Sequence, residues 1–298
     1  MAGGQERVLR RRIRSVNSTR KITKAMELIA AAQIPRALAR ITSNRPYRDG
    51  LRRVVLEAIE GDRFSARRLV ELPEHLDTAS VFVISGDRGL SGPYNNQNLR
   101  AGERLVAELG ARGTRVRLAV AGKKAAPYYR FRGLDVERSF AGFVERPTYA
   151  DAQAIARYLA APFMAGEVQQ VLLVSTRYHS AGRQAVEVRQ LLPFVVDETP
   201  EAPAEGLTGY TEFEPEVAKL LVDLAPRALE SEVFSALLEG AAAFLTGQQR
   251  AMAAATENAD ELARTLTRKM NQARQDAITT EIMEIVGGAE ALRQSKGA

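Results

Sequence analysis

The sequence predicts an α/β protein whose long N- and C-terminal helices form an antiparallel coiled coil, with a small open α/β domain inserted between them. Three observations lead to this prediction. Small or apolar residues recur every three or four positions through residues 252–292, which is typical of a helix packed along a partner helix. Residues 5–58 also repeat apolar residues at helical spacing. Between about residues 75 and 195, short apolar segments alternate with helical ones.

The composition is that of a globular protein without membrane or secretory segments. The chain has 298 residues, of which 45% are hydrophobic, enough for one large or two modest domains. No run of eighteen apolar residues occurs, and the arginine-rich first thirty residues lack an apolar signal core. Cysteine is absent, which excludes disulfides, thiolate metal ligands and cysteine nucleophiles. We therefore expect the protein to be cytoplasmic.

Positive charge is concentrated in the N-terminal segment. Residues 1–60 hold 14 Lys and Arg against 5 Asp and Glu, whereas the whole chain has a net charge of +6. A basic arm followed by a nearly neutral body favours an acidic partner surface, which could be protein, nucleic acid or anionic lipid. The alternative is a basic helix face that only meets solvent.

The C-terminal helix is the element around which we expect the chain to be organised. If its pattern extends back to Pro226, it runs for about 65 residues, or roughly 95 Å. Charged and amide groups on its other faces exclude a membrane span. Its predicted apolar positions are Met252, Ala255, Ala259, Leu262, Leu266, Met270, Ala273, Ala277, Ile278, Ile282, Ile285, Ala289 and Leu292.

The N-terminal helix is expected to be long, basic and amphipathic, and to end at Gly61. Its apolar positions include Ile22, Met26, Ile29 and Ala30. Pro35 lies inside the pattern and predicts a kink near Ile34, because proline removes a backbone donor and clashes with the preceding turn.

The middle of the chain predicts a Rossmann-like α/β domain. We expect strands at 81–84, 115–121, 135–140, 171–176 and 185–192, and helices at 96–109, 125–131 and 149–163. The predicted domains are a shaft of residues 1–60 and 210–298, an α/β domain of residues 70–196 and a proline-rich linker of residues 197–214.

The terminal helices are expected to pack against each other. An α/β domain of about 120 residues is too small to cover both apolar stripes. Pro215 predicts a helix start, and Pro226 predicts a break or kink before the long helix. Gly240 and Gly247 suggest local bending or a close approach by another helix.

The residues do not assemble a catalytic or metal constellation. The turn with Gly86, Gly89 and Gly92 has neither G-x-G-x-x-G spacing nor the lysine of a P-loop, so we favour a structural turn over a phosphate cradle. His75 and His179 have no ligand at metal-binding spacing. We predict no catalytic residue, no metal and no cofactor. A coiled-coil partner protein fits best, with a basic nucleic-acid-binding coiled coil and a phosphate-binding enzyme as the alternatives.

Three segments resemble F-type ATP synthase gamma subunits. They are RIRSVNSTRKITKAMELIAA at residues 12–31, SGDRGLSGPYN at 85–95 and ARQDAITTEIMEIVGGA at 273–289. The segments lie in the family's order and at its spacing across nearly the whole chain. The resemblance is therefore specific.

The resemblance implies the central rotor shaft of the proton-translocating synthase. In that family the coiled coil turns inside a hexameric head of alpha and beta subunits, and the α/β domain meets the epsilon subunit and the membrane c ring. Rotation of the ring drives the catalytic beta sites through their conformations and regulates ATPase activity and proton flow. The expected protein is a single non-catalytic copy, peripheral on the cytoplasmic face of the cell membrane, without nucleic acid.

The resemblance also implies contact residues. Lys21, Lys24 and Met26 match the segment that faces beta loops, and Arg274, Gln275 and Thr279 match the carboxy-terminal contact group. Arg88 belongs to the matching turn, and Arg250 completes the expected subunit-interface residues. There are two departures from the family. Pro35 replaces a polar helix residue, and Gln248 stands where many relatives have arginine, which leaves the role of Arg250 open.

Overall fold

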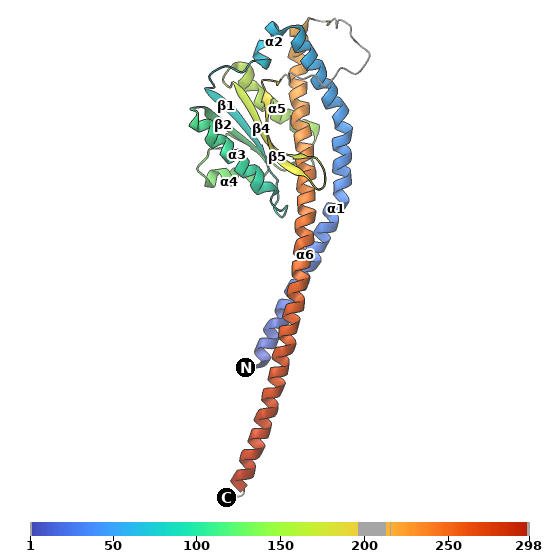
Figure 1. Cartoon of the computed structure of the whole chain (residues 1–298), viewed down its shortest axis with the longest axis vertical. Helices are drawn as coiled ribbons and strands as arrows, with labels where there is room; N and C mark the ends of the chain where they lie inside the picture. The colour runs from blue at the N-terminus through green and yellow to red at the C-terminus, as the bar shows by residue number, and fades with distance from the viewer. Residues whose placement is uncertain (1, 196–212, 215, 297–298) are drawn as a thin grey trace. The chain divides into compact units, whose positions relative to one another are not determined.

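The computed structural model describes residues 2–195, 213, 214 and 216–296 (Figure 1). These residues fall into two compact units, Ala30–Gln248 and Met1–Ile29 with Gln249–Ala298. Most of the predicted linker, and Pro215, lie outside the described residues. The two units are described in turn.

The larger unit contains a five-stranded sheet with the order β3-β2-β1-β4-β5. Its strands are β1 Thr78–Ile84, β2 Arg115–Ala121, β3 Arg138–Phe140, β4 Gln170–Tyr178 and β5 Gln184–Leu192. The first four are parallel, and β5 joins β4 as an antiparallel edge. All seven residues of β1 are buried, as its continuous apolar sequence predicts for a central parallel strand. The predicted strands are confirmed, with β3 shorter than expected.

Helices cover both faces of the sheet. The helices α3 (Tyr94–Ala111) and α4 (Ala125–Phe131) share a core with one face. The opposite face packs against α5 (Tyr149–Ala165) and part of α6 (Val217–Lys296).

The contact between α6 and the sheet corrects one sequence expectation. Leu229, Val233 and Leu237 of α6 join a core with Phe82 and Ile84 of β1. We expected the terminal helices to bury their apolar stripes only against each other. Part of α6 instead belongs to the α/β core, because its residues are apolar on more than one face here and one partner helix cannot cover them all.

The N-terminal helix α1 spans Ala2–Gly61 and is followed by the short helix α2, Arg63–Val70. The predicted end at Gly61 is confirmed. Helix α1 continues through Pro35, and α6 continues through Pro226. A break at Pro226 was therefore the wrong expectation. Pro226 is exposed, while neighbouring Ala228 packs into a core shared with α1, so tertiary packing outweighs the lost backbone hydrogen bond.

The smaller unit is an antiparallel pair made of the start of α1 and the end of α6. Arg20 contacts Asp260 at 2.6 Å, and the Thr23 and Thr256 hydroxyl oxygens lie 2.8 Å apart. Residue numbers rise along one helix as they fall along the other, which confirms the antiparallel direction. Among the described residues, no helix has the length and apolar character needed to cross a membrane.

The buried seam of this pair agrees with the predicted one only in part: Met252, Ala259 and Leu266 are buried, as predicted. Ile22 and Ile29 are 61% and 56% exposed, and Leu262 is 48% exposed, so all three lie outside the seam. Thr23 is buried there instead, and its hydroxyl oxygen contacts the Arg20 carbonyl oxygen of its own helix at 3.0 Å and the Thr256 hydroxyl across the pair at 2.8 Å. Apolar spacing alone missed this, because a paired threonine can replace an apolar residue. Residues 278–289 of α6 are all exposed.

An ion pair in the larger unit carries a pH prediction. Arg117 of β2 donates to the Glu137 carboxylate at 2.6 and 2.8 Å. This hydrogen bonding lowers the pKa of the Glu137 carboxyl below its ordinary value. The resulting stability is present above the unfolded pKa, roughly 4.3, and is lost as the pH falls through the folded pKa. Because both side chains are partly exposed, it is worth under about 1 kcal/mol.

We therefore expect Arg117→Met to lower the melting temperature at neutral pH, and the decrease to shrink below roughly pH 4. Arg115→Met is the control, because the partner of Arg115 is the Thr78 hydroxyl, which does not titrate in this range. Thermal unfolding of the full chain across pH measures both differences. A decrease for Arg117→Met that stays constant with pH would contradict the assignment.

Candidate subunit interface

In the glycine-rich turn, a carboxylate of the protein itself binds the backbone N–H groups that could otherwise hold a phosphate. The Gly86 N–H donates to Asn95 Oδ1 at 2.7 Å. The Asp87 carboxylate accepts from the backbone N–H groups of Lys123, Gly142 and Val144 at 2.9–3.3 Å. A phosphate at this point would lose these donors and face a carboxylate. The geometry therefore supports the structural turn and weighs against a phosphate cradle.

The same turn joins the sheet to α6. A Cβ on Gly247 would lie 2.5 Å from the carbonyl oxygen of Ser91, and a Cβ on Gly86 would lie 2.8 Å from the ring of Phe244. Tyr94 and Phe244 meet edge to face, with ring centroids 5.7 Å apart. Burial raises the pKa of the Tyr94 hydroxyl, so it stays protonated at physiological pH. The element that approaches Gly247 closely is this turn and not a helix.

Arg88 projects from this turn toward solvent. Its guanidinium Nε donates to the Glu145 carboxylate at 2.7 Å, and a second nitrogen also pairs with that group. The Arg88 side chain remains 72% exposed. It is therefore held in one orientation while still open to a partner.

The predicted contact residues of the smaller unit fall into two groups. On α1, Lys21 is exposed, Lys24 pairs with Glu27 at 2.9 Å and Met26 is half-buried. These residues lie near the level of Thr256, which contacts Thr23. On α6, the exposed predicted residues are Arg250, Arg274, Gln275 and Thr279.

Arg274, Gln275 and Thr279 of the second group do not meet the first group. Arg274 lies 18 residues beyond Thr256, which is about five helical turns. The structure therefore does not bring the predicted residues into one site. They lie at separate levels of the same helix pair.

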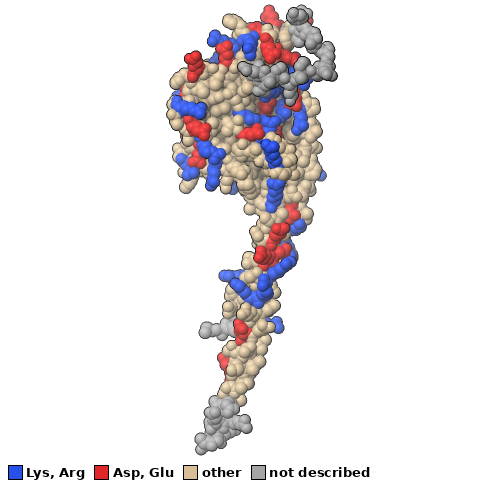
Figure 2. Space-filling view, viewed as in Figure 1, with Lys and Arg blue, Asp and Glu red and all other residues tan. Residues whose placement is uncertain are grey.

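Sequence reasoning missed one basic groove in the smaller unit. The groove has a volume of about 490 Å³ and is lined by Asn17, Arg20, Asp260, Ala263, Arg264, Thr267 and Arg268. Arg264 and Arg268 are four residues apart on one helix, where like charges destabilise each other. This spacing is the signal that could have found them. Lys and Arg side chains gather on the visible face of the helix pair (Figure 2).

The described residues offer little chemistry of other kinds. Within them, no group of three or more His, Asp or Glu side chains could hold a metal ion. His75 is exposed beside Asp77 at 3.3 Å, and His179 lies 3.5 Å from Glu187. Both histidines are exposed and lie next to a carboxylate, as ordinary surface histidines do.

Comparisons with known proteins decide the family. A family model described as ATP synthase matches residues 5–292. The ATP synthase gamma chain of Frankia casuarinae is 46% identical over 293 residues, covering 97% of this chain and 98% of the relative. The chain belongs to the ATP synthase gamma chain family. The gamma chain of Acidothermus cellulolyticus is also similar, at 44% identity over 294 residues, covering 97% of this chain and 98% of that one.

Solved structures share the fold of this gamma chain family member. A chain of the Euglena gracilis mitochondrial ATP synthase aligns with a TM-score of 0.70 at 16% identity, covering 99% of this chain and 97% of that one. A chain from the central stalk and c ring of the Tetrahymena thermophila mitochondrial ATP synthase aligns at 0.62 and 21% identity, covering 78% and 99%. The family resemblance of the three sequence segments is confirmed.

Proposed function

We propose that the chain is the central rotor shaft of an F-type proton-translocating ATP synthase. Rotation of the membrane c ring would turn the shaft, and the shaft would drive the catalytic beta subunits through their conformations. The chain would thereby also regulate ATPase activity and proton flow. The observation that carries this proposal is the full-length match to gamma chains together with the antiparallel helix pair.

The surface chemistry of the helix pair supports a contact that must form and release. Lys21, Arg274 and Gln275 are exposed and can form ion pairs or hydrogen bonds without deep burial. Exposed pairs are worth about 0–1 kcal/mol each, so a partner can leave them at low cost. A shaft can bias a partner's state only through different contact free energies in each state, and a ring of such weak contacts permits this.

The proposed partners are the alpha and beta subunits of the hexameric head, the epsilon subunit and the c ring, with one copy of the chain per complex. The basic helix pair suits acidic loops of the head through charge complementarity. We place the chain at the cytoplasmic face of the cell membrane as a peripheral component. Its proposed role is non-catalytic. In keeping with this, the Asp87 carboxylate already accepts hydrogen bonds from the backbone N–H groups near the glycine-rich turn that could otherwise bind a phosphate.

Copurification tests this proposal. A tagged chain produced in cells that lack their own gamma subunit should recover alpha and beta subunits together with ATP hydrolysis, with one copy of the chain in each complex. Recovery of the chain without a nucleotide-hydrolysing partner would contradict the proposal. Recovery of salt-sensitive nucleic acid instead would favour the alternative of a basic coiled-coil nucleic-acid-binding protein.

A substitution at Gln275 tests the carboxy-terminal contact group. Gln275→Leu should weaken the contact with the head by about twofold to tenfold, because one hydrogen bond is worth about 0.5–1.5 kcal/mol. Because the Gln275 side chain is exposed, we expect the substitution to leave the fold unchanged. ATP hydrolysis of the assembled complex and circular dichroism of the chain separate these effects. Gln97→Leu, at an exposed position of α3, is the matched control, and equal behaviour of both variants would place the interface elsewhere.

A further inference from the structure

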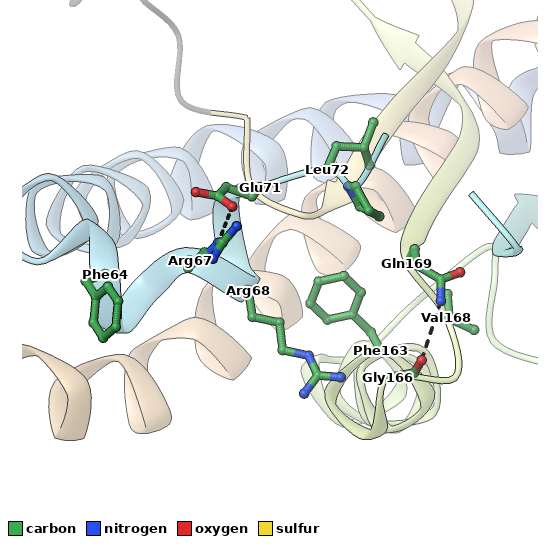
Figure 3. A pocket seen from close by; sticks show the side chains of 10 residues that line it. Phe64, Arg67, Arg68, Glu71, Leu72, Phe163, Gly166, Val168 and Gln169 are labelled. Carbon is green, nitrogen blue, oxygen red and sulfur yellow. Dashed lines mark hydrogen bonds and ion pairs between the residues drawn. The ribbon is translucent and has the colours of Figure 1, made fainter. Parts of the chain in front are cut away.

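A pocket in the larger unit lies between α2 and the end of α5 (Figure 3). It has a volume of about 520 Å³. Phe64, Leu72 and Phe163 supply apolar walls, and Arg67, Arg68 and Glu71 supply charge. None of these residues belongs to the contact areas assigned above.

The exposure of Phe64 is unusual for its size. Its side chain is 89% exposed, at the edge of a concave surface whose Phe163 is almost fully buried. Phe131 is exposed to the same degree, 88%, but does not line this pocket. An exposed aromatic ring beside arginine in a concave surface is the composition of the dominant contacts in protein interfaces.

The described charged side chains that line the pocket are unequal in number, with two arginines and one glutamate. Arg67 donates to Glu71 at 2.5 Å, so these two charges neutralise each other. Arg68 extends toward Gly166 in Figure 3, and no carboxylate within the described part of the chain pairs with it. Its Nη2 lies 2.5 Å from the point where a Cβ on Gly166 would sit, so the guanidinium lies against this glycine. Among the described residues, the pocket therefore presents one guanidinium without a carboxylate partner, beside apolar walls.

We propose that this pocket docks a peptide segment of another subunit, one that presents a carboxylate beside an apolar side chain. Arg68 pairs with the carboxylate, and Phe64, Leu72 and Phe163 cover the apolar side chain. The single positive charge of Arg68 matches the single negative charge of the carboxylate. A planar guanidinium can bind a carboxylate through two hydrogen bonds. This inference rests on the proposed function, because it needs an assembled complex.

An anionic lipid surface is the other class of partner to consider. Recognition of such a surface takes a cluster of about four to eight unpaired Lys or Arg side chains. Here Arg67 is neutralised by Glu71, so within the described residues Arg68 is the one arginine of the pocket without a carboxylate partner. A concave pocket with a buried Phe163 floor also fits one inserted side chain better than a flat headgroup layer. The geometry favours the peptide.

Cross-linking in the assembled complex tests the proposal. Since the chain has no cysteine, Leu72→Cys creates a single attachment point for a short photoactivatable maleimide at the pocket wall. Illumination of the purified complex, followed by mass spectrometry of the adduct, identifies what occupies the pocket. We expect a segment of another subunit with Asp or Glu next to an apolar residue.

Two further variants test the chemistry of recognition. Adding Phe64→Ser or Arg68→Gln should lower the adduct yield at least about fivefold, as expected for a contact that dominates an interface. Phe131→Ser should leave the yield unchanged, because it removes an equally exposed ring outside the pocket.

Several outcomes would overturn the proposal. They are the absence of a protein adduct, an adduct with lipid alone, a captured segment without a carboxylate, or a yield that ignores Arg68→Gln. Copurification with ATP-hydrolysing subunits is measured first on the same sample. If it fails, the proposed function and this inference both fall, whereas an assembled active complex without an adduct removes this inference alone.

Discussion

Replacing Arg48 with methionine is expected to lower the free energy of unfolding by about 3–5 kcal/mol, the usual consequence of leaving a buried charge without its partner. Arg48 of α1 donates to the Ser235 hydroxyl at 2.9 Å and lies 3.8 Å from the Glu239 carboxylate of α6. The Glu239 side chain is only 5% exposed and also accepts from the backbone N–H of Tyr178 at 3.2 Å. This network joins α1, α6 and β4 within the larger unit.

Denaturant unfolding of the full chain, followed by circular dichroism, measures this loss. Arg53→Met is the control, because Arg53 is an exposed neighbour on the same helix and should change stability by less than about 0.5 kcal/mol. Adding Glu239→Gln to Arg48→Met should restore much of the stability, since the unpaired charge is then gone. A loss of the same size in the single and double variants would show that the carboxylate is not the cause.

Gly247→Ala is expected to destabilise the chain by about 2–3 kcal/mol, although alanine is the better helix former by about 1 kcal/mol. The new Cβ would lie 2.5 Å from the Ser91 carbonyl oxygen, and this neighbour is backbone, so the turn or α6 must move. The turn carries Arg88, and its displacement should also reduce coupling in the assembled complex.

The matched control is Gly50→Ala. Gly50 lies in α1 and a Cβ there would meet no atom within 4 Å, so this change should stabilise the chain by up to about 1 kcal/mol. The opposite signs separate helix propensity from steric contact. Thermal unfolding of both variants measures them, and stabilisation by Gly247→Ala would show that the turn does not sit against α6 as described.

The sequence predicted the strands well, because a central parallel strand such as β1 must be apolar along its whole length. It could not predict that Leu229 and Val233 pack against that sheet. Their helical spacing identifies a buried face but not the element that covers it. The same limit explains Ile22 and Ile29, whose apolar character suggested a seam that Thr23 occupies.

The candidate interface was predictable only in part. The family resemblance pointed to Lys21, Gln275 and Thr279, which are exposed on the helix pair. The pocket beside Phe64 and Phe163 joins residues about a hundred positions apart, so no local pattern could indicate it. The turn sequence contains Asp87, but the three backbone donors that bind it come from loops distant in sequence.

In the proposed function, this chain turns as a shaft while its partner subunits catalyse. A single Glu108→Cys change on α3 gives a unique label site, since the chain has no other cysteine and Glu108 is exposed. With the head fixed to a surface and a bead on this residue, ATP hydrolysis should turn the bead continuously in one direction. A bead that stays fixed while ATP is hydrolysed by the same complexes would contradict the account.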